Sequence, residues 1–215
     1  MRIALADDYQ MILEGLRLLF DSEQGMEVVG QAGDGAELVR IVQRNNPEIV
    51  VTEVAMPHLN GIEATRQIKA RNQTTSVVAL TAETQRTIVA QMIRAGAAAY
   101  VTKDCAFEEL VQAIRAVAVG KAYLDTDITS PLLEHYVRNA PGHETSAFET
   151  LTPREREVLQ LVAEGQSTKK IATRMNLSSK TIEFHRHRVM KKLDLNNIAE
   201  LTKYAIRSGI TTLEN

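Results

Sequence analysis

The feature that most constrains the fold is a fivefold alternation over the first 120 residues. Each short apolar run that suits a buried strand is followed by a stretch with apolar residues three or four positions apart, the spacing of a one-sided helix. Strands buried on both faces and joined through helices form a parallel sheet covered on both sides. We therefore expect an α/β domain with a five-stranded, doubly wound parallel sheet, whose strands are 2–7, 26–32, 48–54, 76–81 and 99–102.

A different pattern begins after Gly120. Residues 121–150 are expected to form a linker that contains one helix near 129–139. Only short helices are expected beyond it, and Gly165 and Gly209 follow two of them where a left-handed cap would lie. The four helices are 153–164, 168–175, 179–192 and 197–208. The expected organisation is thus an α/β domain over 1–120, the linker, and a small all-α domain over 151–215.

The net charge of −2 conceals an asymmetry between these parts. Residues 151–215 carry twelve Lys and Arg against seven Asp and Glu, whereas the first 150 carry thirteen against twenty. A basic second part favours a polyanionic partner there. The single Cys105 excludes an internal disulfide framework. No apolar run approaches the roughly 20 residues that span a bilayer, and the N-terminus lacks the pattern of a secretion signal. We expect a cytoplasmic protein without a membrane partner.

Three carboxylates are expected at one edge of the predicted sheet. Asp7 and Asp8 end the first apolar run, and Glu53 ends the third, so they meet where such sheets bind ligands. Thr81 and Lys103 end the fourth and fifth runs. Carboxylates together with water are the ligands that Mg²⁺ prefers, while a hydroxyl and an ammonium suit a phosphoryl group. The sequence therefore predicts a site for Mg²⁺ and phosphate chemistry at this edge.

The order of these motifs resembles the receiver domain of response regulators over residues 1–120. The matching segments are "ADD" after the first strand, "EVAMPHLNG" after the third, "LTA" at the end of the fourth and "YVTKD" at the end of the fifth. The resemblance implies a flavodoxin-like fold and a phosphorylation site. The residues it implies are Asp7, Asp8 and Glu53 around Mg²⁺, Thr81 and Lys103 at the phosphoryl oxygens, and Tyr100 as the aromatic switch.

Glu53 departs from the family, which carries the phosphate-accepting aspartate at this position. The longer side chain moves the carboxylate into the space of the phosphoryl group, and a misplacement of about 1 Å can slow a reaction roughly 10²-fold. We expect little phosphorylation, and a sensor histidine kinase partner only if the position were Asp. The carboxylate could instead reach Lys103 and Thr81 and imitate part of the phosphorylated state, and we expect it to weaken or displace the Mg²⁺. Three interpretations stay open: an engineered activating substitution, a natural regulator working without phosphate, or an inert receiver serving as a dimerisation scaffold.

The all-α part resembles the LuxR-type helix-turn-helix of the NarL/FixJ subfamily. The matching segments are "LTPREREVL", "VAEG", "KIA", "LSSKTIEFH" and "KKL". Ser178 can cap the helix over 179–192, and Ile182 and Val189 form its inward stripe. The outer stripe is long and basic enough to enter a major groove. The resemblance implies that base edges are contacted by Glu183, Phe184 and His187 and the DNA backbone by Lys180, Thr181 and Lys191, and Arg186, Arg188 and Lys192 flank them toward phosphates.

These features together predict a DNA-binding transcriptional regulator of a bacterial two-component system, which is not an enzyme. It is expected to bind double-stranded DNA as a homodimer under receiver control. The helices near 85–95 and 107–118, or the last helix with Leu201 and Ile206, are candidate interfaces. A phosphohydrolase with paired aspartates needs Asp-x-Asp on its first strand, whereas Asp7 and Asp8 are adjacent. A scaffold that has lost DNA binding is opposed by the intact basic helix.

Overall fold

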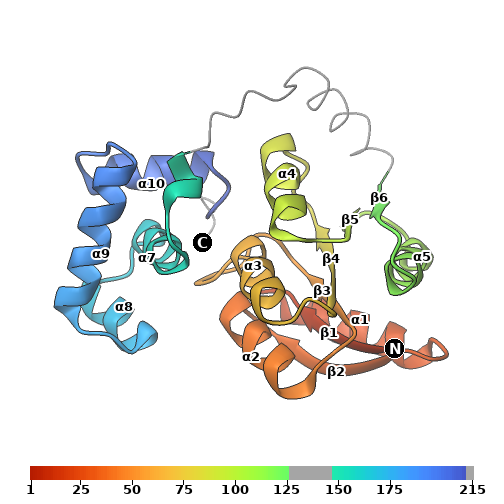
Figure 1. Cartoon of the computed structure of the whole chain (residues 1–215). Helices are drawn as coiled ribbons and strands as arrows, with labels where there is room; N and C mark the ends of the chain where they lie inside the picture. Colours follow the sequence, from red (N-terminus) through yellow and green to blue (C-terminus); the bar gives the residue numbers. More distant parts are fainter. Residues whose placement is uncertain (126–146, 212–215) are drawn as a thin grey trace. The chain divides into compact units, whose positions relative to one another are not determined.

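A computed structural model describes residues 1–125 and 147–211, and the chain divides into two compact units, Met1–Ala140 and Pro141–Asn215 (Figure 1). The helix predicted near 129–139 and most of the predicted linker lie outside the described residues. Each unit has its own hydrophobic core.

The first unit is built on a parallel sheet with the strand order β2-β1-β3-β4-β5-β6. The sheet grows from β1 to one side through β2 and to the other side through β3 to β6, so the topological switch point lies between the neighbouring strands β1 and β3. The carboxyl ends of β1 and β3 therefore form the crevice in which open parallel sheets bind ligands. The strands are β1 (Arg2–Ala6), β2 (Glu27–Ala32), β3 (Ile49–Thr52), β4 (Ser76–Thr81), β5 (Ala99–Thr102) and β6 (Tyr123–Leu124).

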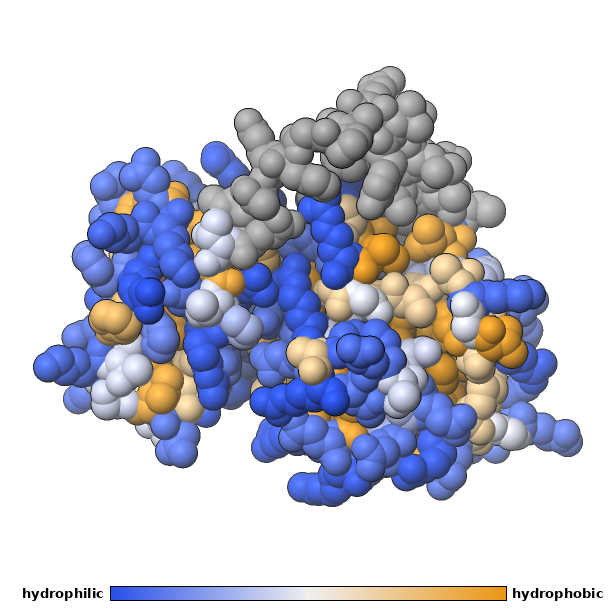
Figure 2. Space-filling model, viewed as in Figure 1, coloured by the Kyte–Doolittle hydropathy of each residue, from blue (hydrophilic) through white to orange (hydrophobic). Residues whose placement is uncertain are grey.

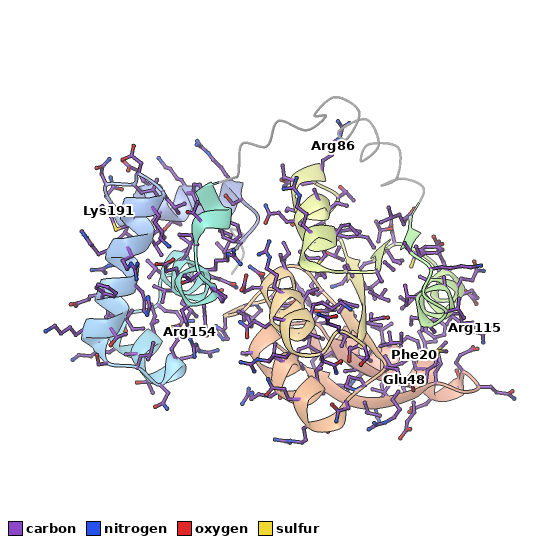
Figure 3. The ribbon with its side chains drawn as sticks, viewed as in Figure 1. Phe20, Glu48, Arg86, Arg115, Arg154 and Lys191 are labelled. Carbon is purple, nitrogen blue, oxygen red and sulfur yellow. The ribbon has the colours of Figure 1, made fainter. Side chains whose placement is uncertain are left out.

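Helices cover both faces of the sheet because side chains alternate along each strand. Ile3 and Leu5 of β1 face one core with α1 and α5, while Ala4 faces the other with α2, α3 and α4. Phe20 of α1, labelled in Figure 3, packs edge-on against Phe107 of α5, and the ring centroids are 5.1 Å apart. The helices are α1 (Gln10–Ser22), α2 (Gly35–Asn45), α3 (Gly61–Arg71), α4 (Arg86–Ala95) and α5 (Phe107–Ala118).

The fold class is as predicted, but the sheet has six strands where the sequence predicts five. The sixth, β6, pairs in parallel with β5 through two residues, which is too short for an alternating pattern to reveal. The functional strands also end earlier than predicted, β1 at Ala6 and β3 at Thr52. Asp7 and Glu53 therefore stand in the loops beyond the strands, where their side chains can converge.

The second unit is a cluster of short helices around a core that includes Val158, Ile182 and Leu201. Thr152 and Glu155 form a capping box at the start of α7, and Ser178 accepts a hydrogen bond from the Thr181 amide at the start of α9. Gly165 and Gly209 have φ of 74° and 65°, the left-handed geometry predicted for them. The elements are η1 (Ala147–Thr150), α7 (Pro153–Ala163), α8 (Thr168–Met175), α9 (Ser179–Lys192) and α10 (Ile198–Arg207).

Among the helices of residues 1–125 and 147–211, none combines the length and the apolar character that crossing a bilayer requires.

Candidate functional site

Glu53 lies at the centre of a network of donors at the carboxyl edge of the sheet. Its side chain is buried, and its Oε2 lies 2.7 Å from the Nζ of Lys103. Its Oε1 accepts hydrogen bonds from the Thr81 hydroxyl and from two backbone amides that follow it, with the Ala55 amide at 3.0 Å. Both carboxylate oxygens are therefore held, as a buried charge requires.

Lys103 connects Glu53 with the first strand. Its Nζ lies 2.6 Å from Oδ2 of Asp7, and the other oxygen of Asp7 accepts the Tyr9 amide at 2.9 Å. Burial disfavours the ammonium, but the hydrogen bonds with Asp7 and Glu53 outweigh it and raise the pKa of Lys103. Lys103 thus stays charged and neutralises two buried acids. Burial, together with the neighbouring Asp7, raises the pKa of the partly buried Asp8.

A chain of hydrogen bonds leads from Thr81 to Tyr100. The Thr81 hydroxyl oxygen accepts the amide of Glu83 at 3.1 Å, and the Tyr100 hydroxyl donates to the carbonyl of Glu83 at 2.6 Å. The Tyr100 side chain is fully buried, and burial raises its pKa. The backbone of Glu83 therefore couples the hydroxyl that binds Glu53 to the position of the aromatic ring.

At the acidic edge, the oxygens of Asp7 and Glu53, two of the three carboxylates expected around Mg²⁺, are engaged within the protein. A magnesium site needs free carboxylate oxygens, whereas the oxygens of Asp7 and Glu53 are bound by Lys103, Thr81 and backbone amides. Within 1–125 and 147–211, no group of three or more His, Cys, Asp or Glu residues is arranged to hold a metal ion. The ammonium of Lys103 supplies the positive charge at this edge.

The second cluster of candidate residues lies on α9. The surface of the second unit is mainly hydrophilic on the face in view in Figure 2, and Lys191 projects from α9 on the side away from α7 (Figures 2 and 3). Phe184 has 57% of its surface exposed, with the Arg188 guanidinium 5.3 Å from its ring centroid. The exposed candidates are Lys180, Glu183, Phe184, His187, Arg188 and Lys191, while Thr181 and Arg186 are half-buried.

Lys192 differs from the other predicted DNA-binding residues. Its Nζ lies 2.6 Å from Oε2 of Glu155, whose side chain is 1% exposed, and donates to the carbonyl of Thr150 at 2.9 Å. Arg188 also leans toward Glu155, with 3.7 Å between its Nε and Oε1. The side chain of Lys192 therefore ties α9 to α7, and we leave it out of the DNA-facing set.

The sequence does not predict two residues of these networks, Glu83 and Glu155. Glu83 takes part through its backbone amide and carbonyl, which every residue type except proline carries, so the sequence does not indicate this role. Glu155 did have a signal, because Thr152 and Glu155 have the spacing of a capping box. That pattern predicts the start of a helix, but it does not predict the ion pair between Glu155 and Lys192, which lies 37 residues away.

A buried acid–lysine–hydroxyl network at the edge of a parallel sheet, joined in one chain to a unit with an exposed basic helix, defines a signalling switch with an output domain. Residues 3–115 match the family model of the response regulator receiver domain, and residues 149–205 match that of the bacterial regulatory proteins of the luxR family. The chain belongs to the response regulators of the NarL/FixJ type, which join these two domains.

Three known proteins illustrate the similarity. The chain is 32% identical over 212 residues to the response regulator UvrY of Escherichia coli (strain K12). The aligned region covers 99% of this chain and 96% of UvrY. RcsB from Salmonella enterica serovar Typhimurium, bound to a promoter with the phosphomimetic BeF3−, gives a TM-score of 0.60 at 28% identity over 98% of this chain and 99% of that one. A structure of two RcsB dimers on two parallel DNAs gives 0.59 at 26% identity, over 95% and 97%.

Proposed function

We propose that the protein is a homodimeric, DNA-binding transcriptional regulator in which Glu53 stands in for the phosphoryl group. The observation that carries the proposal is the network around Glu53, which draws in Thr81 and Lys103, the residues assigned by family resemblance to the phosphoryl oxygens. The carboxylate brings one charge and two oxygens, where a phosphoryl group brings about −1.5 to −2 charges and three oxygens. The expected effect is therefore a partial shift toward the active state.

Tyr100 transmits the state of the site in this proposal. Because Thr81 holds the Glu83 amide and Tyr100 holds the Glu83 carbonyl, the hydroxyl engaged by Glu53 and the buried ring stabilise each other. Loss of the Glu53 contact would free the Thr81 hydroxyl and destabilise the buried position of the Tyr100 ring. The switch thus consists of a few hydrogen bonds that share one peptide segment.

In this proposal, the ammonium of Lys103, held between Asp7 and Glu53, also takes the place of the metal's positive charge. Receiver domains in general bind Mg²⁺ at the phosphorylation site. Here Lys103 binds Asp7 and Glu53 directly, so the side chains satisfy one another without a divalent ion. We propose that Mg²⁺ binds this protein more weakly than it binds a Glu53→Asp variant. The shorter side chain of that variant would leave space for the ion beside Asp7 and Asp8, while Lys103 keeps its contact with Asp7. A sensor kinase would serve as phosphoryl donor only to that variant.

The proposed DNA interface is the outer face of α9. Ser178 caps the start of this helix, and the exposed stripe carries a mixture of cations with one acid and one aromatic ring. RcsB, a relative of the same architecture, has been solved on DNA as a dimer. We assign base edges to Glu183, Phe184 and His187 and phosphates to Lys180, Thr181, Arg186, Arg188 and Lys191.

A pair of substitutions tests the DNA-binding role. Lys191→Ala should weaken binding to all duplexes alike and reduce the salt dependence, because it removes a phosphate contact. His187→Ala should instead change which sequences are enriched from a pool of random duplexes. The measurement is binding-site selection with each variant at fixed salt, followed by titration. Identical effects of the two substitutions would contradict the assignment, and unchanged binding in both would contradict α9 as the interface.

A further inference from the structure

The outer stripe of α9 carries a single acid, Glu183. The other residues of α9 that are charged at neutral pH are all cations: Lys180, Arg186, Arg188, Lys191 and Lys192. The Glu183 side chain is exposed and forms no ion pair or hydrogen bond with any residue of 1–125 or 147–211. Neither Lys180 nor His187 pairs with it, although side chains three and four positions apart are neighbours on a helix. A carboxylate without a cation partner in those residues therefore stands on the surface proposed to meet a polyanion.

A carboxylate in the major groove gains a contact only from a base that offers a hydrogen-bond donor. An ionised Glu accepts hydrogen bonds and donates none, and the phosphates repel its charge. Guanine and thymine present acceptors in this groove, whereas cytosine presents its N4 amino group and adenine its N6 amino group. The adenine amino group lies beside the N7 acceptor of the same base, which repels a carboxylate. Cytosine has no such acceptor on this edge, so it is the base that Glu183 favours.

The neighbouring Phe184 is held on the outside of the helix by side chains on two sides. Its ring is 57% exposed, and the Arg188 guanidinium lies 5.3 Å from its centroid. The His185 ring meets it edge-on, with 6.0 Å between the centroids and 63° between the planes. Arg188 is itself held by the buried Glu155, with 3.7 Å between Nε and Oε1. An apolar ring fixed on a polar face gains from burial against an apolar group, and in the major groove that group is the thymine methyl.

The helix geometry limits how far apart the two bases lie. Glu183 and Phe184 belong to the first half of α9, the part of a recognition helix that contacts base edges. Adjacent positions point about 100° apart, which separates the two side-chain ends by about 8 Å at the outer radius of a helix. Base pairs follow one another about every 3.4 Å. The two bases therefore lie within about three base pairs of each other.

We infer that Glu183 and Phe184 set the sequence preference of this regulator. Each half-site of its operator contains a cytosine, which Glu183 contacts through the N4 amino group, and a thymine, which Phe184 contacts through the methyl group, within about three base pairs. The inference rests on the DNA-binding role proposed above and names the bases of that interface. Glu183 acts chiefly by rejecting other sequences, because without the cytosine its charge is repelled and gains no hydrogen bond.

Binding-site selection with the full chain and a pool of random duplexes at fixed salt tests the cytosine contact. The parent should favour cytosine about tenfold at one position of each half-site. Glu183→Gln should favour adenine at that position, since Gln both donates and accepts, and Glu183→Arg should favour guanine, which offers two acceptors. Asp194→Asn is the matched control, because it removes an exposed acid just beyond the end of α9. It should leave every base preference unchanged.

Replacement of the thymine by deoxyuridine tests the contact of Phe184, because it removes only the methyl group from the duplex. The parent should bind the deoxyuridine duplex about fourfold more weakly than the thymine duplex, as expected for one buried methyl group. Phe184→Ala should bind the two duplexes equally. Titration of both proteins with both duplexes at the same salt concentration gives the four affinities.

Three results would overturn the inference. They are an unchanged base preference in both Glu183 variants, a parental preference for a base other than cytosine at the position they alter, and equal binding of the thymine and deoxyuridine duplexes by the parent. Each of them leaves the proposed interface standing if Lys191→Ala still weakens binding to all duplexes. If neither the Glu183 variants nor Lys191→Ala changes DNA binding, α9 is not the interface and the proposed function fails together with the inference.

Discussion

The two units of this protein each bury a glutamate against a lysine, with different consequences. In the receiver, Oε2 of Glu53 lies 2.7 Å from Lys103, and in the second unit, Oε2 of Glu155 lies 2.6 Å from Lys192. Both carboxylates are buried and both lysine side chains are partly exposed. The chemistry of the two pairs is therefore the same, and their surroundings decide what each one does.

The surroundings differ in whether the lysine has a second carboxylate as a partner. Lys103 has a second carboxylate, Asp7, so it keeps a charged partner if Glu53 changes. Among the described residues, Lys192 has no second carboxylate and otherwise donates to the carbonyl of Thr150. Glu155 also caps α7 and has the more distant Arg188 as a second cation. An ion pair whose lysine can keep a second carboxylate can serve as a switch. An ion pair whose lysine has no second carboxylate serves to hold two helices together. This contrast predicts that the two pairs respond oppositely to substitution.

The largest effect on stability is expected from Lys192→Met. Glu155 would lose its close cation and keep only the Arg188 guanidinium, whose Nε lies 3.7 Å from Oε1. The loss of one partner of a buried pair lowers the free energy of unfolding by about 2 kcal/mol or more. Native-state hydrogen exchange of the α7 and α9 amides measures this. The matched variant Lys191→Met removes an exposed neighbour and should change the free energy by less than about 0.5 kcal/mol. Similar losses of stability in the two variants would show that the Glu155–Lys192 pair does not hold α9 to α7.

Thr81→Val should affect function more than stability. It removes a donor to Glu53 and the acceptor of the Glu83 amide, so the hydrogen-bonded connection between Glu53 and Glu83 is broken. We expect affinity for a selected duplex to fall about tenfold, the equivalent of about 1.4 kcal/mol. Titration of both proteins against the same duplex measures it. Thr84→Val, at an exposed position nearby, is the control. Unchanged affinity in Thr81→Val would remove Thr81 from the switch.

The smallest effect is a difference in acid sensitivity. Burial alone would raise the pKa of Glu155, but hydrogen bonds from Lys192 and the Thr152 amide outweigh it and lower the pKa below its ordinary value of 4.5. The stability from this group is therefore complete above 4.5 and is lost as the pH falls through the lowered pKa. Glu155→Gln should flatten this part of the stability–pH curve of the second unit, measured by hydrogen exchange. An equally steep acid loss in Glu155→Gln would assign it to other groups.

The sequence was sufficient for what depends on motifs and periodicity. The order of the strand-end residues predicted which side chains meet, and the reach of Glu53 toward Lys103 and Thr81 followed from one extra methylene. It was insufficient for contacts between distant segments. Lys191 and Lys192 are adjacent on a helix and differ by about 100° in direction, so one faces outward while the other meets Glu155. The direction of such a side chain depends on α7, which local patterns do not place.

The central claim is that Glu53 holds the switch in place of a phosphoryl group. The most direct test titrates the unphosphorylated protein and its Glu53→Asp and Glu53→Gln variants against the same selected duplex at fixed salt, with affinity and stoichiometry recorded. The shorter Asp cannot reach the donors equally well, and Gln keeps the length without the charge. We predict that the parent binds as a dimer and at least tenfold more tightly than either variant. Equal binding by all three proteins would contradict the claim.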